Sequence, residues 1–141
     1  DTLAKYYDGK YNNTPAYQLL MGYNRAVEKK NISPLVGFEV YQQIDSEIRH
    51  RLVGAVTSTG VEIKSYTPHF IERIIGQTST PHSGMRQGVS VADALDAIQN
   101  PIRIGSPWMT EDGDTRQTFY GESAVVSVSL TDQRLIQTNP S

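Results

Sequence analysis

The chain has no cysteine among its 141 residues, which excludes disulfide bonds and thiolate metal sites. No apolar run approaches the roughly 18 residues of a membrane-spanning helix. A basic surplus is also missing, because 13 basic and 15 acidic residues give a net charge of −2. Many nucleic-acid-binding domains carry such a surplus, so nucleic-acid binding by this chain would depend on a local arrangement of residues.

The motifs that hold common cofactors are absent as well. The sequence contains neither a Gly-x-Gly-x-x-Gly pattern nor a phosphate-cradling loop with a lysine. The three histidines, at positions 50, 69 and 82, form no His-x-x-x-His pair and have no acidic ligand cluster beside them. Metal sites normally use three or four ligands. The sequence therefore predicts no cofactor and no bound metal.

What is present is the composition of an ordinary soluble globular protein, with 38% apolar and 20% charged residues. The length fits one domain, or one domain with a helical extension. The chain begins with Asp-Thr-Leu rather than with methionine. We therefore expect a fragment whose targeting information lies upstream.

Helix signals dominate the first half of the chain. Thr14-Pro15 and Ser33-Pro34 each combine a hydroxyl N-cap with proline at the first helical position. They predict helices at about 15–30 and 34–50. The segments RLVGAV and VEIKSY then flank Gly60 and predict a β-hairpin.

The second half starts with two further helices and ends in strands. Thr67-Pro68 predicts a short helix that ends at Gly76, and Ser90, with a capping box, predicts another that stops at Pro101. After Pro101 the apolar period becomes two, and short connections favour an antiparallel meander. Helices followed by strands predict an α+β fold with an antiparallel sheet of four or more strands.

The short helix after Thr67 carries the most suggestive chemistry. His69 and Arg73 lie four residues apart and therefore share one helix face. A neutral imidazole is a usable general base near pH 7, and a guanidinium suits phosphate geometry. The pair would suit a bound phosphate, but an ordinary ion-pair network with Glu72 and Lys64 explains the same residues. The polar loop that follows carries His82 and Arg86, which either reach a substrate or lie in a plain surface connection.

The order of several motifs adds a family resemblance. A His-Phe-x-x-Arg helix (His69, Phe70, Arg73) precedes, in this order, Gly88-Val89, Ala97 with Asn100-Pro101, Phe119 with Gly121-Glu122, and Asn139-Pro140. Over residues 64–141 this order resembles the C-terminal toxin domains of bacterial polymorphic toxins, especially of the LXG type, and related domains at the ends of phage head proteins. Those domains belong to a nuclease superfamily that groups barnase, EndoU, colicin ribonucleases and RelE.

The resemblance implies a nuclease domain at 64–141, preceded at 1–63 by a helical extension or linker packed on it. It also implies a metal-independent ribonuclease with its active site on the sheet face. A base would remove the ribose 2′-OH proton so that the oxygen attacks the adjacent phosphate, and an acid would protonate the leaving 5′-oxygen. His69 would be the proton shuttle and Arg73 the phosphate ligand.

Further residues are assigned by their positions. Thr118 and Thr138, expected on adjacent strands, would donate hydrogen bonds to phosphate oxygens. The remaining candidates for substrate contact are His82, Arg86, Arg116 and Tyr120. Related sequences often carry a basic residue just before the Phe-x-Gly element, where this chain has Gln117 and Thr118.

A toxin of this kind implies a cognate immunity protein, a nucleic-acid substrate and no membrane partner. It also implies secretion from the producing bacterium and action in the cytoplasm of the target cell. RNA is favoured over DNA as the substrate. Two alternatives stay open: a DNase of the same fold, which would need water as nucleophile and a metal, and a non-enzymatic interaction module.

Overall fold

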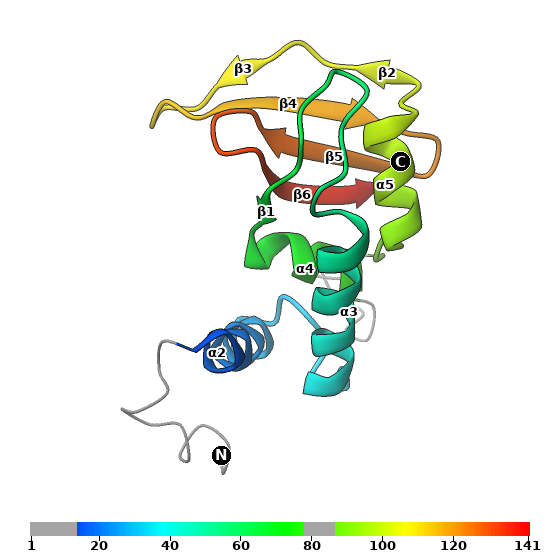
Figure 1. Cartoon of the computed structure of the whole chain (residues 1–141). Coiled ribbons are helices and arrows are strands. Elements are labelled where there is room, and N and C mark those ends of the chain that lie inside the picture. The colour runs from blue at the N-terminus through cyan, green and yellow to red at the C-terminus, as the bar shows by residue number, and fades with distance from the viewer. Residues whose placement is uncertain (1–13, 78–86) are drawn as a thin grey trace.

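The computed structural model describes residues 14–77 and 87–141 (Figure 1). This part contains four helices: α2 (Pro15–Glu28), α3 (Phe38–Arg51), α4 (Pro68–Ile75) and α5 (Val91–Gln99). It also contains six strands: β1 (Ser65–Tyr66), β2 (Arg103–Ile104), β3 (Trp108–Met109), β4 (Thr115–Tyr120), β5 (Ala124–Ser129) and β6 (Arg134–Pro140). The α+β class predicted from the sequence is confirmed.

The strands form one mixed sheet with the order β1-β6-β5-β4-β2, in which β3 also pairs with β4. Strands β4, β5 and β6 are the antiparallel meander expected from their short connections. The prediction of a wholly antiparallel sheet is wrong, because β1 pairs with β6 in parallel. Strand β1 has only two residues, and in the sequence α4, α5 and the other four strands lie between it and β6. Neither its periodicity nor a short connection could reveal its direction.

The helices after β1 begin where their caps predict. The Phe70 N–H donates to the Thr67 hydroxyl at 3.1 Å, and the Asp93 N–H donates to the Ser90 hydroxyl at 3.0 Å. Helix α4 ends at Gly76, whose φ of +78° suits a residue without Cβ. Local hydrogen bonds therefore set where these two helices begin.

In the first half of the chain one prediction is wrong and another holds only in part. Ser33 does not begin a helix, because its hydroxyl accepts from the Leu35 N–H at 3.0 Å and so forms a turn; α3 starts only at Phe38. The hairpin expected around Gly60 is present but short: Val56 and Glu62 form an antiparallel bridge, and the N–H groups of Thr57 and Ile63 donate to the carbonyl oxygens of Val61 and Ala55, both at 2.8 Å. At Ser33, the hydrogen bond from the Leu35 N–H to the hydroxyl thus takes the place of the expected N-cap bond.

One hydrophobic core joins the helices to the sheet. It includes buried Tyr41 and Ile48 of α3, Phe70 of α4, and Phe119 and Val126 of the sheet. Helix α5 packs on β4 and β5, and α4 packs beside β6 (Figure 1). Residues before and after position 64 therefore share the same core.

Two glycines of the motifs behind the family resemblance have a packing role. A Cβ on Gly121 would lie 2.7 Å from both Cα and Cβ of Ala97, so the turn between β4 and β5 can approach α5 only without a side chain. A Cβ on Gly88 would lie 2.4 Å from the carbonyl oxygen of Ile74. Close packing accounts for Gly121, Ala97 and Gly88 without reference to any activity.

Candidate active site

Helix α4 has two faces of opposite character. Phe70, Ile71 and Ile74 are buried in the core, whereas the His69 side chain is 44% exposed. The helix is held against the sheet at its start, where the Thr67 hydroxyl donates to the carbonyl oxygen of Ile136 in β6 at 2.9 Å. The apolar face therefore anchors α4, and its other face presents His69 and Arg73.

The His69 ring lies between the carboxylate of Glu72 and the guanidinium of Arg73. Its Nδ1 lies 3.3 Å from Glu72 Oε1, and its Nε2 accepts a hydrogen bond from Arg73 Nε at 3.0 Å. A guanidinium has donors only, so Nε2 carries the lone pair and the ring proton resides on Nδ1, directed at Glu72. This pattern assigns the tautomer of a neutral imidazole.

Two asparagines extend this network at its ends. Arg73 donates to Asn139 Oδ1 in β6 at 3.1 Å, and Asn31 donates to Glu72 Oε1 at 3.1 Å. The Glu72 side chain is only 11% exposed, so its carboxylate depends on these partners. Sequence reasoning did not predict Asn31 or Asn139 as site residues, and no local signal links Asn139 to Arg73 across 66 positions.

The strand register shows which residues share a sheet face with Asn139. Asn139 pairs with Val125, Val125 with Tyr120, and Tyr120 with Arg103. Directly paired residues project from the same face, and neighbouring strands lie about 4.8 Å apart. We call this the outer face; it consists of Arg103, Trp108, Arg116, Thr118, Tyr120, Val125, Ser127, Ser129, Arg134, Gln137 and Asn139. The opposite face carries Phe119, Val126 and Val128 into the core.

The register therefore brings Arg116, Thr118 and Tyr120 onto the face that adjoins Arg73. The Thr118 hydroxyl bonds to that of Ser127 at 3.1 Å. Arg116 Nε donates to Asp114 at 2.8 Å, and the Ser129 hydroxyl donates to the same carboxylate. These hydrogen bonds, first from Arg116 and then from Ser129, hold the pKa of Asp114 below its ordinary value.

Thr138 does not belong to this site. It pairs with Val126, is 1% exposed, and its hydroxyl donates to the Val125 carbonyl at 2.9 Å. The expectation that Thr118 and Thr138 lie on adjacent strands is also wrong, since β5 separates β4 from β6. The physical reason is a register shift opposite Ser127 and Val128, which reverses the in-and-out alternation along β6. Strict alternation from buried Leu135 would have placed Thr138 on the outer face.

The burial of Thr138 leads to a testable distinction. Thr138→Val is expected to lower the free energy of unfolding by about 1 kcal/mol, because a buried hydrogen bond is lost at nearly constant volume. If the chain cleaves RNA, as the family resemblance implies, cleavage per folded molecule should be unchanged. Urea unfolding and a cleavage assay measure the two effects. A variant with wild-type stability and lost cleavage would return Thr138 to the site.

The other two predicted contacts, His82 and Arg86, lie outside the residues that the structure describes. His50 is placed on α3, with its Nδ1 2.7 Å from the Ser46 carbonyl oxygen. It therefore takes part in the hydrogen bonding of its own helix and lies apart from the His69 network.

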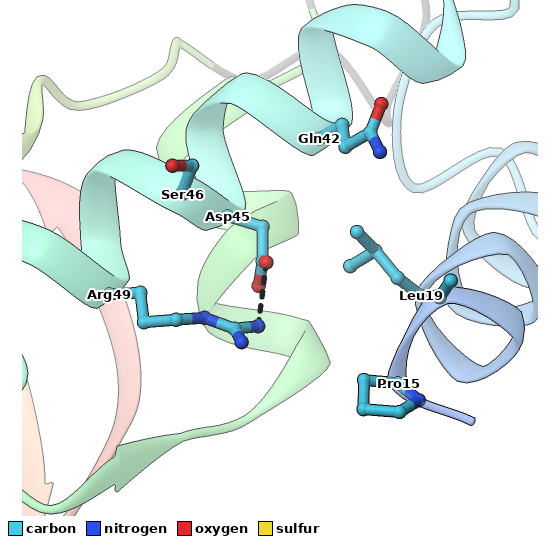
Figure 2. A pocket seen from close by; sticks show the side chains of 7 residues that line it. Pro15, Leu19, Gln42, Asp45, Ser46 and Arg49 are labelled. Atoms are coloured by element: carbon cyan, nitrogen blue, oxygen red, sulfur yellow. Dashed lines mark hydrogen bonds and ion pairs between the residues drawn. The ribbon is translucent and has the colours of Figure 1, made fainter. Parts of the chain in front are cut away.

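A groove of about 360 Å³ lies between α2 and α3, and a neighbouring hollow of about 290 Å³ shares its wall (Figure 2). Arg49 contacts Asp45 at 2.8 Å, and the Tyr66 hydroxyl donates to the other oxygen of the same carboxylate. Burial, followed by this hydrogen bond, raises the pKa of Tyr66 to about 12. These polar groups bind one another, so the groove presents no free base or nucleophile from this cluster.

Within residues 14–77 and 87–141, no helix is long and apolar enough to cross a membrane. In the same ranges, no three histidine or acidic side chains gather as they would around a metal ion.

No protein-family model, curated protein or solved structure matches the chain. A functional proposal must therefore rest on the hydrogen-bonded network beside the outer face. This network consists of Asn31, Glu72, His69, Arg73 and Asn139.

Proposed function

We propose that this chain is a ribonuclease domain that cleaves RNA by attack of the ribose 2′-OH on the adjacent phosphate, without a metal ion. The observation that carries the proposal is the His69–Arg73 pair, held by Glu72 and Asn139 at the edge of the outer face. This arrangement combines a neutral imidazole with a fixed tautomer and a cation of the geometry that phosphate favours.

In the proposed reaction, Nε2 of His69 takes the proton of the 2′-OH. The 2′-oxygen then forms a bond to phosphorus, and the bond from phosphorus to the 5′-oxygen breaks. The products are a 2′,3′-cyclic phosphate and a 5′-hydroxyl group, which requires a proton from a general acid. Glu72 accepts from Nδ1 and so orients the ring and stabilises the imidazolium that forms.

Arg73 has a second role in this scheme. Its Nε–H occupies the lone pair of His69 Nε2 in the unliganded site. When Arg73 turns to a bound phosphate, Nε2 becomes free to act as base, and the guanidinium stabilises the charge that develops on the phosphate oxygens. Substrate binding and activation of the base are then one event.

The second proton transfer, or a further phosphate contact, is proposed for His82 or Arg86, which lie outside the residues that the structure describes. The wider context is a toxin secreted by one bacterium that acts in the cytoplasm of another, with a cognate immunity protein that blocks the site. RNA is the proposed substrate in preference to DNA because only RNA has the 2′-OH that His69 would activate.

The proposal predicts cleavage that survives chelation. The purified domain is incubated with total bacterial RNA and, separately, with plasmid DNA, each with and without EDTA. RNA fragments that end in a 2′,3′-cyclic phosphate should form in both conditions, and an RNA with 2′-O-methyl groups throughout should resist cleavage. DNA cleavage abolished by EDTA would instead identify a metal-dependent DNase, and intact RNA and DNA would favour an interaction module.

A further inference from the structure

Two pairs of an arginine and an aromatic ring lie on the outer face, far across the sheet from α4. The guanidinium carbon of Arg103 lies 3.7 Å from the centre of the Tyr120 ring, and that of Arg116 lies 5.9 Å from the centre of the Trp108 ring. Trp108 is 47% exposed, which is high for the largest apolar side chain. An exposed ring beside a cation, as Trp108 is beside Arg116, is a group that stacks on nucleic-acid bases. Tyr120 is half-buried, and the guanidinium of Arg103 lies over its ring.

The charges of this face suit a polyanion although the whole chain is acidic. Arginines reach it from four elements: Arg73 of α4, Arg103 of β2, Arg116 of β4 and Arg134 of β6. The acidic partners are Asp114, 2.8 Å from Arg116, and Asp132, 3.7 Å from Arg134. The Arg134 side chain is 40% exposed, so this arginine can meet a ligand on the outer face.

The size of the face matches a short stretch of nucleic acid. The Tyr120 and Arg116 rows are four residues apart along β4, or about 13 Å at the usual rise of a strand. The row from Asn139 to Arg103 crosses three strand spacings, or about 14 Å. Several nucleotides therefore fit between the His69 network and Trp108.

We propose that the outer face binds single-stranded RNA, with unpaired bases stacked on the Trp108 ring and on the Tyr120 ring with its covering Arg103 guanidinium, and with the backbone phosphates bound by the other arginines. The inference rests on the proposed ribonuclease function and names its substrate class. A base inside a duplex has both faces covered by its neighbours, so only an unpaired base can stack on these rings. The face would thus select unpaired RNA and lead its backbone towards Arg73 and His69.

Trp108 is the only tryptophan of the chain, so tryptophan fluorescence reports on this position alone. The His69→Ala variant, which prevents cleavage, is titrated with oligoadenylate of about 12 nucleotides, a length within the range of single-strand sites. Saturable quenching is expected, and the affinity should fall as salt is raised. A stable RNA hairpin of the same length should give little quenching. Equal binding of the hairpin would overturn the proposal.

Two variants of β3, Trp108→Ala and Met109→Ala, distinguish base stacking from nonspecific binding to an exposed apolar side chain. In the His69→Ala background, Trp108→Ala should weaken binding of fluorescein-labelled oligoadenylate by about tenfold, the cost of one lost stacking contact. Met109→Ala is the matched control, because Met109 is 69% exposed and adjacent but projects from the opposite face. It should bind as the parent does. Equal weakening by both variants, or none by Trp108→Ala, would refute the stacking surface.

Cleavage by the chain with His69 intact keeps the two proposals apart. If it cuts RNA and Trp108→Ala binds and cuts equally well, the stacking surface is wrong while the ribonuclease proposal stands. If oligoadenylate quenches Trp108 but no RNA is cut, the ribonuclease proposal fails and the surface remains an RNA-binding one. Thermal unfolding of each variant shows whether a lost signal reflects a lost fold.

Discussion

His69→Ala is expected to lower the rate of RNA cleavage by roughly 100- to 10,000-fold, the usual contribution of a general base. The free energy of unfolding should fall by no more than about 1 kcal/mol, the cost of one lost hydrogen bond to Glu72. The His69 side chain is 44% exposed, and Glu72 keeps its bond from Asn31 when the ring is removed. Single-turnover cleavage of a labelled RNA and urea unfolding measure the two quantities.

The matched control is His50→Ala. His50 lies on α3 and bonds to the Ser46 carbonyl oxygen of its own helix, so its removal should leave cleavage unchanged. A cleavage rate that drops equally for both variants would point to a general effect of histidine removal. Full activity of the His69→Ala protein would exclude His69 as the base and leave its contacts with Glu72 and Arg73 as an ordinary polar network.

Phe70→Ala, one residue further along, is expected to have the opposite effect, lowering the free energy of unfolding by about 3–5 kcal/mol. Phe70 is fully buried, and its ring is part of the core that joins α4 to α3 and the sheet. Helix α4 has only eight residues, too few to be stable in water without this packing. Urea unfolding followed by circular dichroism measures the loss.

Because α4 carries His69, cleavage by the Phe70→Ala protein should follow the folded fraction as urea is raised. Ile102→Ala serves as the comparison, since Ile102 is 74% exposed and its truncation should cost less than about 0.5 kcal/mol. A loss below about 1 kcal/mol for Phe70→Ala would contradict the buried position of this ring. The contrast between His69→Ala, which affects activity, and Phe70→Ala, which affects stability, would then be lost.

Several features of this protein follow from short stretches of sequence. The caps at Thr67 and Ser90 begin α4 and α5 through bonds to residues three positions on. The four-residue spacing of His69 and Arg73 brings their side chains together on any helix. In the structure, Arg73 Nε lies 3.0 Å from His69 Nε2. The alternation after Pro101 is enough to predict the meander. In each case the partners are close in sequence, so local geometry decides the outcome.

Other features depended on contacts between distant parts of the chain. The bulge in β6 turned Thr138 into the core, and the parallel partner of β6 came from a two-residue strand. Asn139 reaches Arg73 across 66 positions, and Trp108 joins the outer face only because β3 pairs with β4.

The sequence by itself therefore determined where α4 and α5 begin, the α+β class and the adjacency of His69 and Arg73. Only the tertiary structure decided which residues share the outer face with them. Strand register depends on pairing between segments, and a single extra residue moves every following side chain to the opposite face.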